Sequence, residues 1–169
     1  MYIKLMYLIL CVSLIFSGCT NVTKSNKDTS SNSKQVVEKN RSIQNSPKQV
    51  VKNYFKYKNE KNKNDIEKLL TKDSLGPNHT WGFEDLEYIK LININEETNP
   101  TFKDGYLSNG RGSINGVKKE NVKVYKVDYN VKYKEGAVTA EKNGKNTSWF
   151  FVIRKDKNSP WLIDGQGQP

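Results

Sequence analysis

Two side chains have the chemistry of a general acid or base. His79 is the only histidine of the chain and lies in a loop beside Trp81, where it could serve acid–base chemistry or simply a polar surface. Asp128 lies between Tyr125 and Tyr129, and an aromatic environment raises the pKa of a carboxylate. The alternation of that segment equally favours an outward, solvated Asp128. We expect no enzyme, and the hypothesis of acid–base catalysis gains support only if Asp128 and His79 meet in one cavity.

Metal and thiol chemistry have few candidate residues. The two cysteines, Cys11 and Cys19, both lie near the N-terminus, and the rest of the chain has none. A disulfide framework and a cysteine-based zinc site are therefore excluded beyond residue 19. A single histidine gives too few ligands for zinc, and the carboxylates lack the spacing of a calcium loop. We expect no metal and no cofactor.

Large aromatic residues are spread over the second half of the chain and one predicted helix. Such side chains belong first of all to a core. If the fold encloses a pocket, these residues are also the candidates for its wall: Tyr54, Tyr125, Tyr129, Trp149 and Trp161.

Residues 1–18 have the features of a secretory signal peptide. Lys4 is their only charged side chain, an apolar run extends from Leu5 to Phe16, and small residues follow. The run is shorter than the roughly 20 apolar residues that a membrane-spanning helix needs. We expect residues 1–18 to be removed; the alternative is an uncleaved N-terminal anchor.

Phe16-Ser17-Gly18-Cys19 resembles the lipobox of bacterial lipoproteins, with Phe16 where leucine is usual. In such proteins the cysteine is linked by a thioether to diacylglycerol and becomes the first mature residue. The resemblance implies a lipoprotein carrying palmitate-type acyl chains on Cys19, held outside the cytoplasm at the cell membrane. Each buried CH₂ group of the lipid contributes about 0.8 kcal/mol to anchoring.

Residues 19–45 follow as a tether, and residues 46–169 as one domain. The tether is rich in Ser, Asn, Thr and Lys and has no aromatic residue, so it buries too little apolar surface to order itself. The net charge of the whole chain is +10. This charge suits an anionic lipid, wall polymer or nucleic acid as a weak partner, although no specific nucleic-acid motif is present.

Two helices are predicted at the start of the domain. Ser46 and Pro47 fit the N-cap and first position of a helix that ends at about Asn59, with Gln49 completing a capping box. A second, short helix is predicted from Asn64 to Leu70. Lysines gather on the side of the first helix opposite its apolar residues, and they favour either a solvated face or one turned to anionic lipid or wall polymer: Lys48, Lys52, Lys56 and Lys63.

The rest of the domain has mainly the pattern of strands. Residues 122–134 alternate apolar and polar side chains, which predicts a strand with one wet face. Further strands are predicted at 83–95, 137–141, 149–153 and 161–164, with Asn143-Gly144 as a hairpin turn and 165–167 as a tail. Residues 96–121 carry turn signals, and we expect a loop or irregular hairpin there. Within it, Gly110-Arg111-Gly112-Ser113 resembles a phosphate-binding loop but lacks the strand-to-helix context.

This order predicts an α+β fold, with two helices followed by a curved antiparallel meander of four or five strands around the long helix. The Val-Val-x-x-Tyr-Phe pattern of residues 50–55, Leu69-Leu70, and the segments 149–152 and 161–165 resemble the cone-shaped nuclear transport factor 2-like superfamily. More narrowly, residues 46–165 are similar to a domain-of-unknown-function family of small surface lipoproteins from low-GC Gram-positive bacteria. Enzymes of the superfamily place an acid or histidine in the open mouth of the cone.

Three functions are compatible with these residues. The first is a non-enzymatic, lipid-anchored surface domain that binds a protein or small amphiphilic ligand at the cell envelope, with the membrane as a partner through its lipid. The second is a small isomerase- or hydrolase-like enzyme that uses a cone pocket. The third is an electrostatic binder of anionic wall polymer or DNA. The sequence leaves the ligand and the oligomeric state open.

Overall fold

The computed structural model describes residues 46–76 and 79–167. The predicted signal peptide 1–18, the lipidation site Cys19 and the tether to residue 45 lie outside the described residues. Among the described residues, no helix combines the length and the apolar character that crossing a membrane requires.

The first described element is the helix α2 (Pro47–Asn59), as the sequence predicts. Ser46 is its N-cap, and its side chain accepts a hydrogen bond from the Gln49 amide at 3.2 Å. The reciprocal half of the predicted capping box is absent among the described contacts, because the Gln49 side chain donates to Asn53 instead. The apolar side is buried, with Val51 and Phe55 almost fully covered, and the lysines of the other side are exposed.

The second helix, α3 (Lys63–Glu67), begins one residue earlier and ends three residues earlier than predicted. Its cap is Asn62, whose side chain accepts from the Asp65 amide at 3.2 Å. After it, the chain runs beside the last strand, where Leu70 and Ile163 form a parallel bridge, before a 3-10 turn η1 (Lys72–Ser74).

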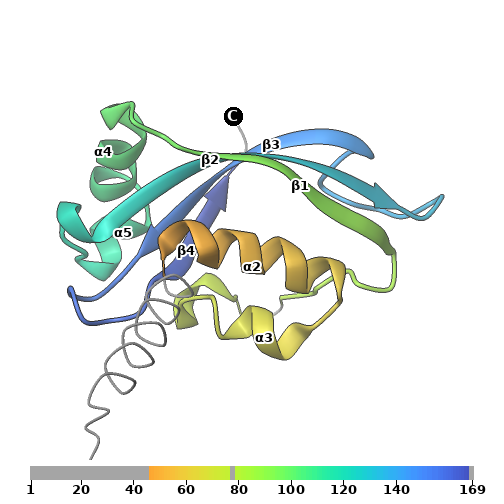
Figure 1. Cartoon of the computed structure of the whole chain (residues 1–169), viewed down its shortest axis with the longest axis horizontal. Helices are drawn as coiled ribbons and strands as arrows, with labels where there is room; N and C mark the ends of the chain where they lie inside the picture. The colour runs from red at the N-terminus through yellow and green to blue at the C-terminus, as the bar shows by residue number, and fades with distance from the viewer. Residues whose placement is uncertain (1–45, 77–78, 168–169) are drawn as a thin grey trace, which may run out of the picture.

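Four antiparallel strands form one open sheet in the order of the sequence, and α2 lies across one face of it (Figure 1). The strands are β1 (Leu86–Glu96), β2 (Val122–Tyr133), β3 (Gly144–Ile153) and β4 (Leu162–Gly167). The predicted meander is confirmed. The strand predicted at 137–141 is wrong, because these residues belong to the connection between β2 and β3, and residues 165–167 continue β4 instead of forming a tail.

The loop predicted at 96–121 is wrong. Between β1 and β2 the structure has the helices α4 (Pro100–Ser108) and α5 (Arg111–Asn115) and the 3-10 turn η2 (Lys119–Asn121). The turn signals delimit helices: Asn99 is an N-cap that accepts from the Thr101 amide at 3.1 Å, with Pro100 as the first helical residue. Gly116 then ends α5 in the left-handed region, with φ 66°.

As a result, the sheet has a core on both faces. Tyr125, Val127 and Tyr129 of β2 pack with α2. On the opposite face, Val122 and Val124 pack with Tyr106 of α4 and with other side chains of that second core. On the face of β2 away from α2, α4 covers Val122 and Val124 at the start of the strand. The solvent-exposed face predicted for β2 is therefore limited to the residues after Val124.

Candidate functional site

A buried carboxylate on the edge strand is the centre of a hydrogen-bond network inside the domain. Asp164 of β4 is 2% exposed. Its Oδ1 accepts from the Thr71 hydroxyl at 2.6 Å and from Arg111 Nη2 at 3.3 Å. Its Oδ2 accepts from the Tyr106 hydroxyl at 2.7 Å, from Asn115 Nδ2 at 3.1 Å and from Arg111 Nε at 3.2 Å. Four side chains thus supply five hydrogen bonds to one carboxylate.

These contacts decide the charge of Asp164. Burial alone raises the pKa of this carboxyl, but the hydrogen bonds from Thr71, Tyr106 and Arg111, together with the charge of Arg111, outweigh burial and lower it. Burial and the hydrogen bond to Asp164 raise the pKa of the Tyr106 hydroxyl. At neutral pH the Asp164 carboxylate is therefore ionised and accepts hydrogen bonds, and the Tyr106 hydroxyl is neutral and donates one.

The donors of this network come from three separate segments. Thr71 precedes η1, Tyr106 lies in α4, and Arg111 and Asn115 lie in α5. Asp164 therefore holds the helical insertion between β1 and β2 against β4. A general base needs a free lone pair directed at a substrate proton, whereas the lone pairs of this carboxylate are engaged. The arrangement favours a structural anion rather than a catalytic one.

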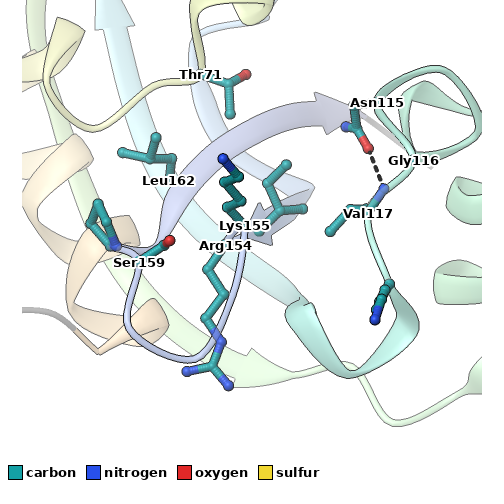
Figure 2. A pocket seen from close by; sticks show the side chains of 11 residues that line it. Thr71, Asn115, Gly116, Val117, Arg154, Lys155, Ser159 and Leu162 are labelled. Atoms are coloured by element: carbon teal, nitrogen blue, oxygen red, sulfur yellow. Dashed lines mark hydrogen bonds between the residues drawn. The ribbon is translucent and has the colours of Figure 1, made fainter.

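A hollow with mainly apolar walls lies beside this network, at the end of the sheet where β3 turns into β4 (Figure 2). We call it the β3–β4 pocket. Its volume is about 450 Å³, within the range of small-molecule sites. Apolar side chains form most of its wall: Val117, Ile153, Pro160 and Leu162. Thr71 and Asn115, two of the donors to Asp164, also line it, so the buried network supports one wall of the pocket.

Three cations and no carboxylate belong to the lining of the β3–β4 pocket: Lys118, Arg154 and Lys155. The Arg154 guanidinium is already engaged, since it lies over the Trp161 ring at 4.6 Å and donates from Nε to Asn121 at 3.0 Å. Figure 2 shows the Arg154 guanidinium pointing away from the hollow, while the Lys155 side chain extends between Leu162 and Val117. Lys155 is thus the cation best placed to face a ligand.

The structure does not bring Asp128 and His79 together. Asp128 lines a hollow of about 270 Å³ on the face away from α2, where it accepts from the Thr147 hydroxyl at 2.7 Å. His79 contacts Trp81 edge-on, with 4.4 Å between ring centroids, and Trp81 packs on the core under α2. The two side chains therefore lie on opposite faces of the sheet, in different hollows.

The aromatic residues predicted as pocket candidates also separate. Tyr125 and Tyr129 lie in the core under α2, where the Tyr129 hydroxyl donates to Glu141 at 2.6 Å. Trp149 lies in the core on the other face, stacked on Phe102 at 4.9 Å. The Trp161 ring packs against the Arg154 guanidinium described above. Tyr54 lines a hollow of about 220 Å³ that also contains His79 and one side of Asp164.

The Asp164 network and the pocket beside it are not among the features predicted from the sequence. In the sequence, Arg111 belongs to a tetrapeptide that resembles a phosphate-binding loop, and Asp164 is the last residue of a short predicted strand. One signal was available: Asn99-Pro100 repeats the cap that Ser46-Pro47 provides for α2, and it would have predicted the helix that carries Tyr106. Within residues 46–76 and 79–167, no group of three or more His, Cys, Asp or Glu side chains is placed to hold a metal ion.

Four antiparallel strands in an open sheet, with helices on both faces and a buried carboxylate at the edge strand, define a mixed helix-and-sheet domain. The chain belongs to the family described as a domain of unknown function, DUF4829, whose model matches residues 48–167. The predicted likeness to a family of unknown function is thereby confirmed over nearly the predicted span. No curated protein and no solved structure matches the chain.

Proposed function

We propose that this protein is a lipid-anchored, extracytoplasmic domain that binds a small amphiphilic ligand at the cell envelope without catalysing a reaction. The β3–β4 pocket is the observation that carries the binding function, because it combines apolar walls with a cationic side. The engaged lone pairs of Asp164 and the separation of Asp128 from His79 support the non-enzymatic part. The lipobox-like Phe16–Cys19 supports the anchor.

We also propose that the fold is a variant of the nuclear transport factor 2-like cone. The long helix α2 lying across one face of the sheet supports it (Figure 1). The helices α4 and α5, inserted between β1 and β2, would be the departure of this family from a simple meander.

The anchor is tested on the full chain with Cys19→Ala. We expect the parent protein in the membrane fraction, with a mass that fits removal of residues 1–18 and addition of diacylglycerol, and the variant in the soluble or secreted fraction. A variant that stays wholly in the membrane fraction would contradict the lipidation of Cys19.

Ligand binding is tested by filling the pocket. Val117→Phe places a larger side chain in the wall of the β3–β4 pocket and should weaken the binding of a neutral apolar fluorescent probe. Val138→Phe is the matched control, because Val138 is 99% exposed and lies far along the connection between β2 and β3. Equal probe binding by both variants and the parent would argue against this pocket as the site.

The enzyme alternative has its own test. Turnover of a substrate by the purified domain, lost on Asp128→Asn, would overturn the non-enzymatic proposal. A substrate search with esters and small ketones, the classes suited to a hydrolase or isomerase, is the direct measurement.

A second candidate function rests on α2. The helix has four lysines and no acidic residue, and Lys48 and Lys52 are exposed on the side away from the core. A lysine near a helix N-terminus is unfavourable with respect to the helix dipole, which suggests a use other than stability. Retention on anionic wall polymer that falls steeply with salt would support this electrostatic function, and flat salt dependence would reject it.

A further inference from the structure

The charged residues that line the β3–β4 pocket all have one sign. Lys118, Arg154 and Lys155 line it, and no acidic residue does. Arg154 is committed to Trp161 and Asn121. Lys118 and Lys155 are exposed, and neither forms an ion pair with a carboxylate of residues 46–76 or 79–167. Two ammonium groups are therefore available to a bound anion.

The carboxylate next to Lys155 in the chain is Asp156. The hydrogen bond from the Asn158 amide lowers the pKa of Asp156, and the charge of Lys155 helps to lower it, although the Lys155 and Asp156 side chains form no ion pair. Asp156 accepts hydrogen bonds from the Asn158 and Ser159 amides at 2.8 Å and 3.0 Å, which close the turn between β3 and β4. Asp164, behind the pocket wall, is neutralised by Arg111. Lys118 and Lys155 are thus the lining cations that form neither an ion pair nor a contact with an aromatic ring among the described residues.

The polar atoms in the wall of the pocket are also engaged. The Thr71 hydroxyl donates to Asp164, and the Asn115 amide donates to Asp164 and accepts from the Val117 amide at 3.0 Å. A ligand therefore finds apolar contacts along Val117, Ile153 and Leu162, with unengaged charges beside them. A polar molecule without an apolar part would leave these walls uncovered.

We infer that the β3–β4 pocket binds an anionic amphiphile, with its acidic head at Lys155 and Lys118 and its acyl chain along Val117, Ile153 and Leu162. This inference rests on the proposed ligand-binding function and adds the sign of the head group. The same chemistry is offered by a free acyl carboxylate and by an anionic phospholipid of the membrane.

The test compares two ligands with the same chain and opposite charge. Decanoate and decylammonium, below their micellar concentrations, are titrated by calorimetry into the chain from Thr20 onward, which keeps both cores. We expect decanoate to bind about tenfold more tightly, the size of one favourable charge contact at a partly exposed site. Equal affinities or a preference for decylammonium would overturn the inference while leaving the apolar pocket intact. Binding of neither would reject the proposed function itself.

Charge-removing variants locate the head group. Lys155→Gln and Lys118→Gln should each lower decanoate affinity several-fold and leave decylammonium unaffected or slightly improved. Lys157→Gln is the matched control, since Lys157 is an exposed lysine of the same turn that does not line the pocket. A similar loss in all three variants would mean general electrostatics and would contradict the site.

A second arm distinguishes the two sources of the ligand. The same proteins are sedimented with vesicles of phosphatidylglycerol and with vesicles of phosphatidylcholine. Weaker phosphatidylglycerol binding by Lys155→Gln, but not by Lys157→Gln, identifies a membrane lipid as the ligand. Vesicle binding that Lys155→Gln leaves unchanged, together with lost decanoate binding, identifies a free amphiphile. Loss of neither overturns the inference.

Discussion

The Tyr106 hydroxyl donates to Asp164 Oδ2 at 2.7 Å across 58 residues of sequence. This contact joins the helix α4 to the edge strand β4, and Arg111 and Asn115 of α5 reach the same oxygen. The helical insertion, the edge strand and one wall of the β3–β4 pocket therefore depend on one carboxylate. The stability of the domain and the shape of its pocket should respond together when that carboxylate is changed.

We expect Asp164→Ala to reduce the free energy of unfolding by about 3 kcal/mol, because it leaves buried Tyr106 and the Arg111 guanidinium without their acceptor. Urea denaturation followed by tryptophan fluorescence measures this change. Asp128→Ala is the matched control: it removes a half-buried carboxylate with one hydrogen bond from Thr147, and should cost no more than about 1 kcal/mol. Equal losses in both variants would contradict the special role of Asp164.

The network also predicts how stability depends on pH. The folded-state pKa of Asp164 lies below the ordinary value of 3.8, so the unfolded chain takes up the proton first as the pH falls. The contribution of Asp164 is complete above the unfolded value and is lost as the pH falls through the lower folded value. Thr71→Val removes one of the hydrogen bonds that lower this pKa.

Unfolding by urea at several pH values between 3 and 6 measures the effect. We expect the parent protein to lose stability on acidification below about pH 4, and Thr71→Val to show a smaller loss over the same interval from a lower starting stability. Parallel curves for the two proteins would mean that the Thr71 hydrogen bond does not favour the ionised form of Asp164.

Two glycines of the insertion offer a matched pair. A Cβ at Gly112 would lie 2.7 Å from Tyr106 Cε1 and 2.9 Å from its backbone oxygen, whereas a Cβ at Gly105 has open space around it. Gly112→Ala should therefore destabilise the domain by about 1–3 kcal/mol through overpacking. Gly105→Ala, in the exposed part of α4, should stabilise it by about 0.5–1 kcal/mol.

Thermal unfolding of the two variants gives the comparison. We also expect Gly112→Ala to weaken probe binding in the β3–β4 pocket, because a shifted α5 displaces Asn115 from its wall. An Ala at Gly112 without cost would show that α5 is loosely held against Tyr106.

The parts of the fold that could be predicted are those with local signals. Ser46-Pro47 marks the start of α2, and the alternation in residues 122–134 marks β2, because capping and strand periodicity depend on neighbours in sequence. The sequence predicts a loop where α4 and α5 form, because asparagine, glycine and proline occur both in turns and at helix ends. The buried side of α4 is the side that carries Tyr106, and it is buried by contact with β2 and β3. This contact joins segments distant in sequence, so the local pattern does not show it.

The site was harder to predict for the same reason. Thr71 and Arg111 lie 93 and 53 residues from Asp164, and no spacing rule connects them. Asp128 and His79 are the best candidates by residue type and local setting, but the sheet places them on opposite faces. The positive side of the β3–β4 pocket likewise forms only where the turn after β3 meets the end of α5.

The two edges of the sheet differ in how they are closed. At β4, the Ile163 amide donates to the Leu69 carbonyl, and the Ile163 carbonyl accepts from the Thr71 amide. At β1, the Ile89 amide donates to the Asn59 side chain at the end of α2, and the Ile94 amide to the side chain of Asn93. A second chain that tried to extend the sheet would find these amides occupied, and strand addition is the usual route by which exposed edges polymerise. Strand addition at these positions would first have to break the contacts that Ile163, Ile89 and Ile94 make within their own chain.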